Sequence, residues 1–358
     1  MMAVRDFPET PFLVLDLEIF ERNVAHMAHT IIAQGGKFWR PHVKAIRSPA
    51  LTLRLINAGA RGVTCATIAE AEAMVAAGVQ EVLIASPVVA TGQLQRLAAL
   101  NRQARVIASV DAAEHLTLLA VAAQAVGSRI PVVIEVDVGL KRSGVPPGDA
   151  AVTLARAVHA NPALLFCGLM AWEGQTTRIA DPAAKQVAVR SAVGLLTDSA
   201  LRCREAGLPV EIVSCGGTGT YTITSTLPGV TELQAGGGVF GDLRYRTEFH
   251  MPLEQALILR ATVLSRPTAR RVVCNAGWRY LGVYPTLSRA THLPGVVQTT
   301  PSAEHLTLDC DRDVVGLAVG DRIDLDVGYS DSTVFLHREI FAVRRGVVEE
   351  VLQIPAAV

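Results

Sequence analysis

The sequence has no excess of charge of either sign. Its 358 residues include 33 Lys and Arg and 33 Asp and Glu, so the formal net charge is +0 at neutral pH. Binding to nucleic acid or to an anionic membrane draws on a field of positive charge, which this composition does not supply. The balance therefore argues against a nucleic-acid-binding protein and against a protein held at a membrane surface.

The sequence also lacks paired cysteines and long apolar runs. Its six cysteines are scattered and form no C-x-x-C pair, which is typical of reduced thiols in a cytosol. No apolar stretch approaches the ~20 residues of a membrane-spanning helix, and the amino-terminal segment has no basic region followed by a long apolar run. These features predict a soluble cytoplasmic protein without a membrane segment.

Hydrophobic residues, in contrast, make up 50% of the chain, enough to bury a large core in two structural units. From about residue 11 to about residue 245, short apolar, β-branched runs alternate with longer alanine-rich segments that have helical spacing. Strand followed by helix, repeated about eight times, predicts an α/β fold, a parallel (β/α)8 TIM-type barrel. The candidate strands are residues 12–16, 38–44, 62–67, 81–86, 104–110, 131–138, 164–172, 210–217 and 232–237.

The pattern changes after about residue 250. Short alternating strands, separated by Gly, Pro and Asp turns, replace the helical spacing, as in "GDRIDLDVG" at residues 320–328. We therefore predict a barrel over residues 11–250 and a second, all-β domain over residues 251–358 together with residues 1–10.

Lys44 lies in "FWRPHVKAIRSP", residues 38–49, at the carboxyl end of a predicted barrel strand. Catalytic groups of barrel enzymes lie at such strand ends and in the loops that follow them. An ε-amine on a proline-flanked backbone can form a Schiff base there, whereas the alternative is a solvated surface lysine.

Two glycine-rich stretches favour the Schiff base. "SCGGTGTYT" (214–222) ends one late strand, and "QAGGGVFGDLRY" (234–245) ends the next. Backbone N–H groups in such loops form an anion site, and the last two loops of a barrel frequently hold a phosphate, although one loop alone is equally a tight turn. A late phosphate site combined with an early lysine is the arrangement of a barrel-type pyridoxal phosphate enzyme.

Three further candidates lie between the lysine and the glycine loops. Arg142 follows a very apolar strand and offers a bidentate fork to the cofactor or to the substrate carboxylate. Trp172 is expected beside the cofactor ring or as a filler of the barrel mouth. Glu173 is expected to face the pyridine nitrogen or water.

In the β domain, Tyr329 and Asp331 are two residues apart, which places them on one side of an extended segment. Asp331 together with His305 or His337 offers ligands for a divalent metal (Mn, Mg or Zn), or acid and base groups. The alternative is that both histidines are ordinary strand residues, because they lack the tight spacing of a metal motif.

These motifs together resemble one family. "TPFLVLDLEIFERNV", "RPHVKAIRSPAL", "EVDVGLKRSGV", "SCGGTGTY" and "AVGDRIDLDVGYSDSTVFLHREIFAVRRG" occur in the order found in the D-threonine aldolase and D-serine dehydratase family, over nearly the whole chain. That family has the alanine-racemase-like fold type of pyridoxal phosphate enzymes. The resemblance implies a barrel that holds pyridoxal 5'-phosphate, a β domain that closes the active site, and a homodimer.

The resemblance also implies roles for single residues. The lysine of the family's R-P-H-x-K motif, which forms the Schiff base, corresponds to Lys44, with Arg40 and His42 beside it. The arginine after the E-V-D-x-G strand corresponds to Arg142. The phosphate-binding positions correspond to Gly216, Gly217, Thr218, Gly219, Thr220, Gly237 and Gly238.

Two positions depart from the family pattern. Trp172 replaces a tyrosine near the pyridine nitrogen, and an indole cannot accept a proton from that ring. Tyr329 replaces a histidine that, with a cysteine or aspartate two residues later, commonly binds a divalent ion, and a tyrosine is a poor metal ligand at neutral pH. Either Asp331 binds a metal with other ligands, or Tyr329 acts as acid or base without a metal.

We therefore predict a pyridoxal-phosphate-dependent lyase that cleaves a β-hydroxy-D-amino acid, a small-molecule substrate, to glycine and an aldehyde. The predicted catalytic residues are Lys44, His42, Tyr329 and Asp331. The alternatives are dehydration of D-serine or hydroxyaspartate to a keto acid and ammonia, and racemisation with Tyr329 as the partner of Lys44. A non-catalytic pyridoxal phosphate carrier is a hypothesis of another class, which the polar segment 326–339 disfavours.

Overall fold

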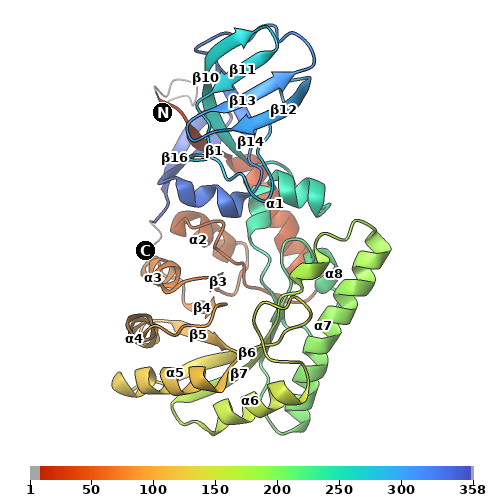
Figure 1. Ribbon diagram of the computed structural model, residues 1–358. Helices are drawn as coiled ribbons and strands as arrows, with labels where there is room; N and C mark the ends of the chain where they lie inside the picture. Colours follow the sequence, from red (N-terminus) through yellow and green to blue (C-terminus); the bar gives the residue numbers. More distant parts are fainter. Residues whose placement is uncertain (1–8, 356–358) are drawn as a thin grey trace. The chain divides into compact units, whose positions relative to one another are not determined.

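The structure is a computed structural model that describes residues 9–355, so the outermost parts of the predicted β domain, residues 1–8 and 356–358, lie outside the described residues. The chain divides into two units (Figure 1). We call residues 25–44 and 52–236 the barrel unit, and residues 9–24, 45–51 and 237–355 the β unit. The sequence pattern predicts the boundary at residue 250, and in the structure the unit changes between Gly236 and Gly237.

Eight strands form the sheet of the barrel unit, and every neighbouring pair is parallel. Their spatial order is β2-β9-β8-β7-β6-β5-β4-β3. The strands are β2 (Phe38–Trp39), β3 (Val63–Cys65), β4 (Glu81–Ile84), β5 (Arg105–Val110), β6 (Ile130–Glu135), β7 (Leu164–Met170), β8 (Ile212–Cys215) and β9 (Glu232–Leu233).

The two ends of this order are joined by the backbone just before Lys44. The His42 N–H donates to Gln234 O on one side, while the Val43 N–H donates to Thr64 O on the other. His42 and Thr64 are also paired in parallel. The sheet is therefore closed, which confirms the predicted parallel barrel.

Helices alternate with these strands, and successive helices from α3 to α8 contact one another around the sheet (Figure 1). Local chemistry sets several of their ends: Thr67 Oγ1 accepts from Glu70 N–H at 3.2 Å before α3, and Asp181 accepts from Ala184 N–H at 2.7 Å before α7. The helices are α1 (Leu17–Ala28), α2 (Pro49–Asn57), α3 (Ile68–Ala76), α4 (Thr91–Leu100), α5 (Ala113–Ala125), α6 (Asp149–Ala160), α7 (Pro182–Glu205) and α8 (Tyr221–Thr224).

The barrel core combines an apolar cluster with an ion network. The cluster contains buried side chains from five adjacent strands, β4 to β8: Leu83, Ile107, Val133, Cys167, Met170 and Ile212. Because this apolar cluster cannot satisfy a charge, any charged side chain among the strands needs a partner of opposite sign.

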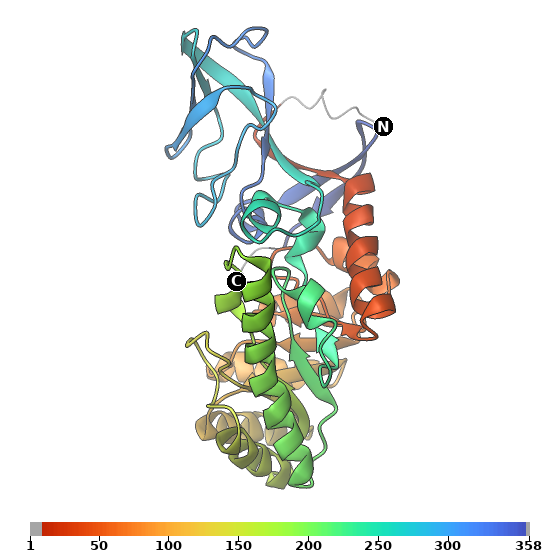
Figure 2. The same cartoon turned by 90° about the vertical axis from the view of Figure 1, so that its right-hand side faces the viewer.

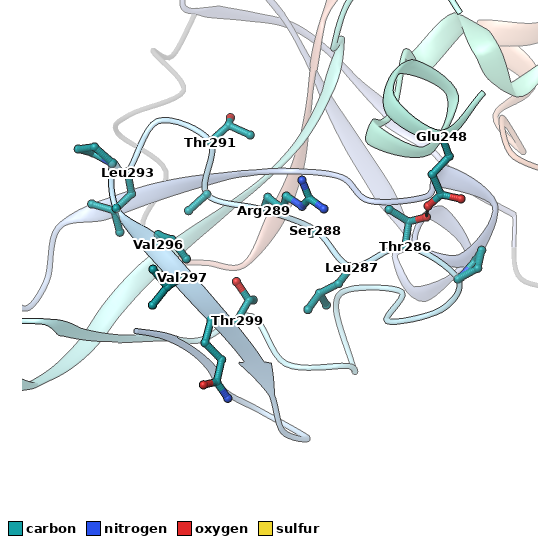
Figure 3. A pocket seen from close by; sticks show the side chains of 15 residues that line it. Glu248, Thr286, Leu287, Ser288, Arg289, Thr291, Leu293, Val296, Val297 and Thr299 are labelled. Atoms are coloured by element: carbon teal, nitrogen blue, oxygen red, sulfur yellow. Dashed lines mark hydrogen bonds between the residues drawn. The ribbon is translucent and has the colours of Figure 1, made fainter. Parts of the chain in front are cut away.

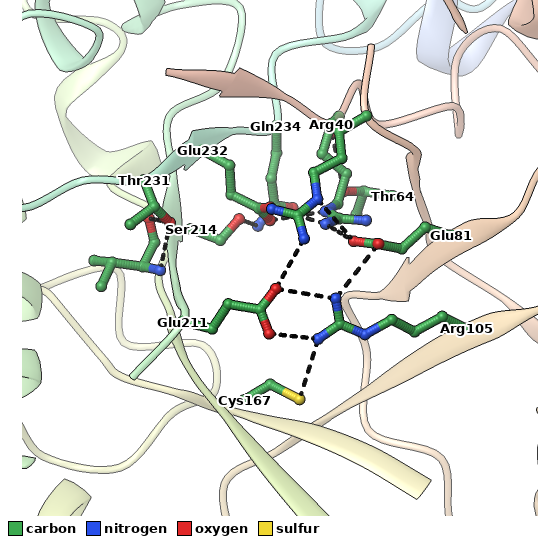
Figure 4. A network of polar contacts seen from close by, with 12 residues as sticks. Arg40, Thr64, Glu81, Arg105, Cys167, Glu211, Ser214, Thr231, Glu232 and Gln234 are labelled. Atoms are coloured by element: carbon green, nitrogen blue, oxygen red, sulfur yellow. Dashed lines mark hydrogen bonds and ion pairs between the residues drawn. The ribbon is translucent and has the colours of Figure 1, made fainter. Parts of the chain in front are cut away.

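The network supplies those partners (Figure 4). Arg40 Nε lies 2.8 Å from Glu232 Oε1, and Arg105 Nη2 lies 2.8 Å from Glu211 Oε2. Arg40 also pairs with Glu81, and Arg61 pairs with Glu211 at 2.8 Å. Three arginines and three glutamates thus balance, and the members lie on or next to strands β2, β3, β4, β5, β8 and β9.

The β unit contains a mixed sheet in the order β12-β13-β11-β10-β1-β15-β16, with β14 paired to β10. β10 is long: its first half pairs with β1 and β14, and its second half pairs with β11 (Figure 2). The strands are β1 (Phe12–Asp16), β10 (Leu257–Thr268), β11 (Arg271–Cys274), β12 (Val296–Pro301), β13 (Leu306–Cys310), β14 (Arg322–Asp326), β15 (Glu339–Arg344) and β16 (Val347–Gln353). Short helical turns interrupt this unit, which is mainly β: η4 (Gly237–Phe240), η5 (Arg244–Glu248), η6 (Ser330–Ser332) and η7 (Val334–Leu336).

Strand β1 corrects one element of the sequence prediction. The run "FLVLD" is apolar throughout and is predicted as a barrel strand, yet it pairs antiparallel with β10 and parallel with β15. Phe12 and Val14 pack against Phe341 and Val343, while Leu13 is fully buried. A central strand of a mixed sheet is buried on both faces, so its composition matches that of a parallel barrel strand.

The structure also describes the longest helices and the cysteines, two features considered in the sequence. No helix among residues 9–355 is long and apolar enough to cross a membrane. All six cysteines are buried free thiols.

Candidate active site

Lys44 follows the segment that closes the barrel, and its side chain is exposed. Its backbone N–H lies 3.4 Å from His42 Nδ1, which accepts from it. The loop after β9 packs tightly against the backbone of His42, because a Cβ on Gly236 would lie 2.1 Å from His42 O. This position in the loop therefore requires glycine.

The imidazole of His42 lies among cations. Burial, followed by the charges of Lys44 and Arg142, lowers the pKa of His42 well below its ordinary value. The ring is therefore neutral at physiological pH, and its Nδ1 is the acceptor of the Lys44 N–H. The structure thus brings together Lys44, His42 and Arg142, three residues selected from the sequence, in an environment with an excess of positive charge.

Arg40, the fourth residue expected here, has other partners. Its guanidinium is fully buried and pairs with Glu232 and Glu81. Burial alone lowers the pKa of Arg40, but the two carboxylates outweigh it, and the net shift is upward. Arg40 thus contributes to the ion network of the barrel.

The first glycine stretch forms the loop between β8 and α8. Gly216 has a φ of +79°, a conformation that side-chain-bearing residues rarely adopt. Gly216, Thr218, Gly219 and Thr220 are buried, and Gly217 is half-buried. Within this loop the Gly217 N–H donates to Thr220 Oγ1 at 3.1 Å and the Thr220 N–H donates to Gly217 O at 3.0 Å, so the loop forms a tight turn.

Trp172 packs on this loop. A Cβ on Gly217 would lie 2.2 Å from Trp172 Cη2, and one on Gly174 would lie 2.5 Å from its Nε1. The indole thus lies against two glycines, one in its own loop and one in the predicted phosphate loop.

Glu173 differs from its predicted role. Its buried carboxylate accepts from Gly216 N–H at 3.2 Å, Thr220 Oγ1 at 2.7 Å and Thr224 Oγ1 at 2.9 Å. Both carboxylate oxygens therefore bind the glycine loop and the helix that follows it. Sequence reasoning missed this role, and the only signal was a carboxylate in an otherwise apolar and small-residue stretch.

The second glycine stretch belongs to the β unit from Gly237 onward. Gly237 and Gly238 are buried in η4. A Cβ on Gly237 would lie 2.7 Å from the hydroxyl of Tyr245, so this tyrosine packs directly on the glycine.

Tyr245 also contacts the two catalytic candidates of the β unit. Tyr329 Oη donates to Asp331 Oδ2 at 2.9 Å, and Tyr245 Oη donates to Asp331 Oδ1 at 3.4 Å. Burial and the charge of Asp331 raise the pKa of Tyr329 and the pKa of Tyr245. Both phenols are therefore protonated donors, and Tyr245 is a member of this group that sequence reasoning missed.

The sequence predicts that Tyr329 and Asp331 lie on one extended segment. In the structure the backbone that carries them is not a continuous strand. Tyr329 is extended, and η6 begins at the next residue. Asp242 holds the turn: its Oδ2 accepts from Ser330 N–H at 2.8 Å and from Ser330 Oγ at 2.7 Å. Burial raises the pKa of Asp242 to about 7.

The predicted metal ligands do not fit a metal centre. Among residues 9–355 no group of three or more His, Cys, Asp and Glu side chains is placed to hold an ion. His337 Nε2 is 2.8 Å from Tyr280 O, and His305 is exposed in the turn before β13. Asp331 meets two phenol donors, and its prediction as a metal ligand with His305 or His337 finds no support in this donor set.

A hollow of about 680 Å³ lies within the β unit (Figure 3). Its wall consists of Glu248 and residues 285–291 and 293–299. None of the predicted site residues lines this hollow.

Comparison with known proteins adds to this geometry. Residues 15–244 match the model of the alanine racemase N-terminal domain, and residues 256–343 match that of a putative serine dehydratase domain. A D-threonine aldolase from Arthrobacter sp is 33% identical over 97% of this chain and 92% of its own length.

Two solved structures have the same fold over all or nearly all of the chain. The D-threonine aldolase from Filomicrobium marinum superposes with a TM-score of 0.92 at 34% identity, over 97% of this chain and 94% of the other. The D-threo-3-hydroxyaspartate dehydratase from Delftia sp. HT23 superposes with a TM-score of 0.89 at 26% identity, over 100% of both chains. The chain therefore belongs to the alanine-racemase-like family of pyridoxal-phosphate-dependent enzymes, within the group of D-threonine aldolases and hydroxyaspartate lyases.

Proposed function

We propose that this chain binds pyridoxal 5'-phosphate in its barrel unit and cleaves β-hydroxy-D-amino acids to glycine and an aldehyde. The observation that carries this proposal is the grouping of Lys44, His42 and Arg142 where the barrel closes. The similarity to two D-threonine aldolases, each over most of the chain, supports the choice of reaction.

The residues present fit this cofactor. Lys44 and Arg142 are close enough to His42 to depress its pKa, so the region is suited to the anionic phosphate and carboxylate groups of cofactor and substrate. The glycine-rich loop from Gly216 to Thr220, which Glu173 holds in place, is the part of the barrel unit that we propose for the phosphate. We propose that Gly237 and Gly238 contribute further N–H groups.

In this proposal Lys44 is the covalent attachment point and Arg142 binds an anionic group of the cofactor. When bound, pyridoxal phosphate supplies the electron sink that permits a bond at the substrate Cα to break. The protein decides which bond that is by placing a proton acceptor at the β-hydroxyl. Trp172, which packs on Gly217, shields the loop from water.

We assign that proton transfer to Tyr329 and Asp331. The Tyr329 phenol donates to Asp331 Oδ2, so a proton taken from the β-hydroxyl by Tyr329 Oη can be balanced by transfer of the phenol proton to the carboxylate. His42 is the second candidate, although its lowered pKa makes it a weaker base than an ordinary histidine. No metal ion is needed in this scheme, which agrees with the donor set around Asp331.

Dehydration is the second candidate, favoured by the similarity to the Delftia dehydratase over the full chain. Racemisation is a third, in which we propose the Tyr329 phenol as the second proton-transfer group and Lys44 as the first. A carrier without catalysis would give no product at all. Identification of the products distinguishes these four possibilities: cleavage, dehydration, racemisation and cofactor binding without catalysis.

The deciding experiment is product identification after incubation with D-threonine, D-serine and D-alanine. We expect glycine and acetaldehyde from D-threonine. Keto acid and ammonia would indicate the dehydratase, the L-enantiomer would indicate a racemase, and unchanged substrate with bound cofactor would indicate a carrier.

Two controls accompany this assay. Lys44→Ala is expected to abolish the visible absorbance band of bound cofactor, and a wild-type protein that stays colourless with pyridoxal phosphate would refute cofactor binding. Activity is expected to survive chelation of divalent ions. A loss that Mn²⁺ restores would show that a metal takes part.

We also propose a homodimer in a reducing, cytoplasmic environment. The family resemblance supports the dimer, and the buried free thiols support the compartment. Light scattering of the purified protein tests the dimer directly.

A further inference from the structure

The loop that carries Arg142 is fixed at both ends and in its middle. Val145 N–H donates to Glu135 O and Asp137 N–H donates to Val145 O, each at 2.9 Å. Gly144 N–H donates to Asp111 Oδ2 at 2.8 Å. The backbone below Arg142 is therefore rigid, while the arginine side chain itself is 59% exposed.

Glu135, the last residue of β6, lies beside this side chain. It is 3% exposed, and its Oε1 accepts from Ser143 Oγ at 2.9 Å and lies 3.5 Å from Arg142 Nη2. Its Oε2 is buried and has no hydrogen-bond partner within residues 9–355. Burial raises the pKa of Glu135, against the effect of Ser143 and Arg142.

A buried carboxylate oxygen without a hydrogen-bond partner costs free energy. If Glu135 served only to support the loop, an amide or an apolar side chain at this position would give a more stable fold. A carboxylate with one oxygen anchored and the other open matches the fork of a guanidinium, which donates two parallel N–H groups. The guanidinium of Arg142 already lies beside this carboxylate, with Nη2 3.5 Å from Oε1.

We propose that Glu135 is a positioning residue that orients Arg142 toward an anionic group of the bound cofactor. Ser143 anchors one carboxylate oxygen, and the carboxylate holds the guanidinium of Arg142 beside it both before and after the cofactor binds. The opposite face of the guanidinium then presents N–H groups to the ligand. The inference rests on the proposed function, since it assumes that Arg142 binds the cofactor.

A first experiment needs no cofactor. Arg142 is labelled with phenylglyoxal and followed by peptide mass spectrometry in the wild type and in Glu135→Gln, with Arg202 as an internal reference. Because Arg202 pairs with Asp149 on the surface, the substitution leaves it unaffected. We expect labelling of Arg142 to become several-fold faster in the variant relative to Arg202, and equal rates would overturn the inference.

A second experiment measures the dissociation of pyridoxal phosphate from the holoenzyme by ultrafiltration. Glu135→Gln and Arg142→Gln are each expected to weaken retention about 10-fold, and the double variant no more than about 2-fold beyond either, because both act through one contact. Losses that multiply to about 100-fold would show independent roles and overturn the inference.

Two further variants guard against misfolding. Ser143→Ala keeps the carboxylate and removes its anchor, so it is expected to give a smaller increase in labelling of Arg142. Glu72→Gln breaks a surface pair with Arg96, whose Nε lies 2.7 Å from Glu72 Oε1, and is expected to match the wild type in both assays. A wild type that binds no pyridoxal phosphate would refute the proposed function, while the labelling result would still decide whether Glu135 holds Arg142.

Discussion

Tyr329 is the residue whose chemistry depends most on its neighbours. A tyrosine replaces the histidine expected from the family pattern, and its phenol donates to Asp331, which also receives the phenol of Tyr245. Arg244 lies over its ring, with Cζ 4.7 Å from the centroid. The hydroxyl therefore has a defined direction, which a general acid or base needs.

Removal of this hydroxyl tests its role. In Tyr329→Phe we expect kcat for D-threonine cleavage to fall by roughly 10²-fold or more, with little change in KM, because general acid–base groups contribute about 10²–10⁴-fold. Steady-state kinetics measures both constants. Tyr284→Phe is the matched control, because Tyr284 is 79% exposed, and an unchanged kcat in Tyr329→Phe would contradict the assignment.

Asp242 gives a prediction about pH. Its pKa rises to about 7 in the folded chain from 3.8, so its contribution to stability is present below about pH 4 and is lost as pH rises through about 7. Measured against Asp242→Asn, the wild type is expected to lose up to about 4 kcal/mol of unfolding free energy between pH 4 and 8. Urea unfolding at several pH values checks this, and parallel curves for the two proteins would contradict it.

At the scale of elements, the loop between β8 and α8 depends on a residue from another loop. Glu173 follows β7 and satisfies Gly216, Thr220 and Thr224 with its two carboxylate oxygens. Because glycine-rich backbone has high conformational entropy when unfolded, such cross-bonds are needed to hold one conformation.

We expect Glu173→Ala to loosen this loop. Three donors lose their acceptor, at a cost of roughly 1–3 kcal/mol for each group left buried and unsatisfied. Hydrogen exchange over residues 216–224 should accelerate, and pyridoxal phosphate should dissociate faster. Glu205→Ala, at an exposed helix end, is the control, and unchanged exchange in Glu173→Ala would count against a structural role for this carboxylate.

At the scale of the whole molecule, the ion network joins strands that are far apart in the chain. Arg40 and Arg61 lie on the two sides of the β2–β3 closure, and Glu232 belongs to β9. A buried pair is a weak source of net stability, yet loss of one partner leaves an unpaired buried charge.

Arg40→Met should therefore destabilise the chain by roughly 3–5 kcal/mol, because the buried carboxylate of Glu232 loses its countercharge, while Glu81 keeps its contacts with Arg61 and Arg105. Urea unfolding followed by circular dichroism measures the change. Arg22→Met, at an exposed pair with Glu254, should have no measurable effect. Equal midpoints for Arg40→Met and the wild type would show that the network adds nothing.

Much of the architecture followed from local pattern. Alternation of apolar strands with alanine-rich helices predicted the barrel, and proline-flanked Lys44 and the glycine stretches were found at strand ends without any knowledge of contacts. The exception, β1, has a composition that suits either sheet, and only its pairing with β10 and β15 distinguishes them.

The partners of the charged side chains could not be predicted in this way. Glu173 binds a loop 43 residues away, Tyr245 meets Asp331 across 86 residues, and Arg40 meets Glu232 across 192. The sequence by itself determined which segments become strands and which residues stand at their ends, because hydrophobic periodicity and turn chemistry act over a few residues. Only the tertiary structure decided which carboxylate faces which cation or hydroxyl, because burial makes such pairing obligatory but leaves the choice of partner to the fold.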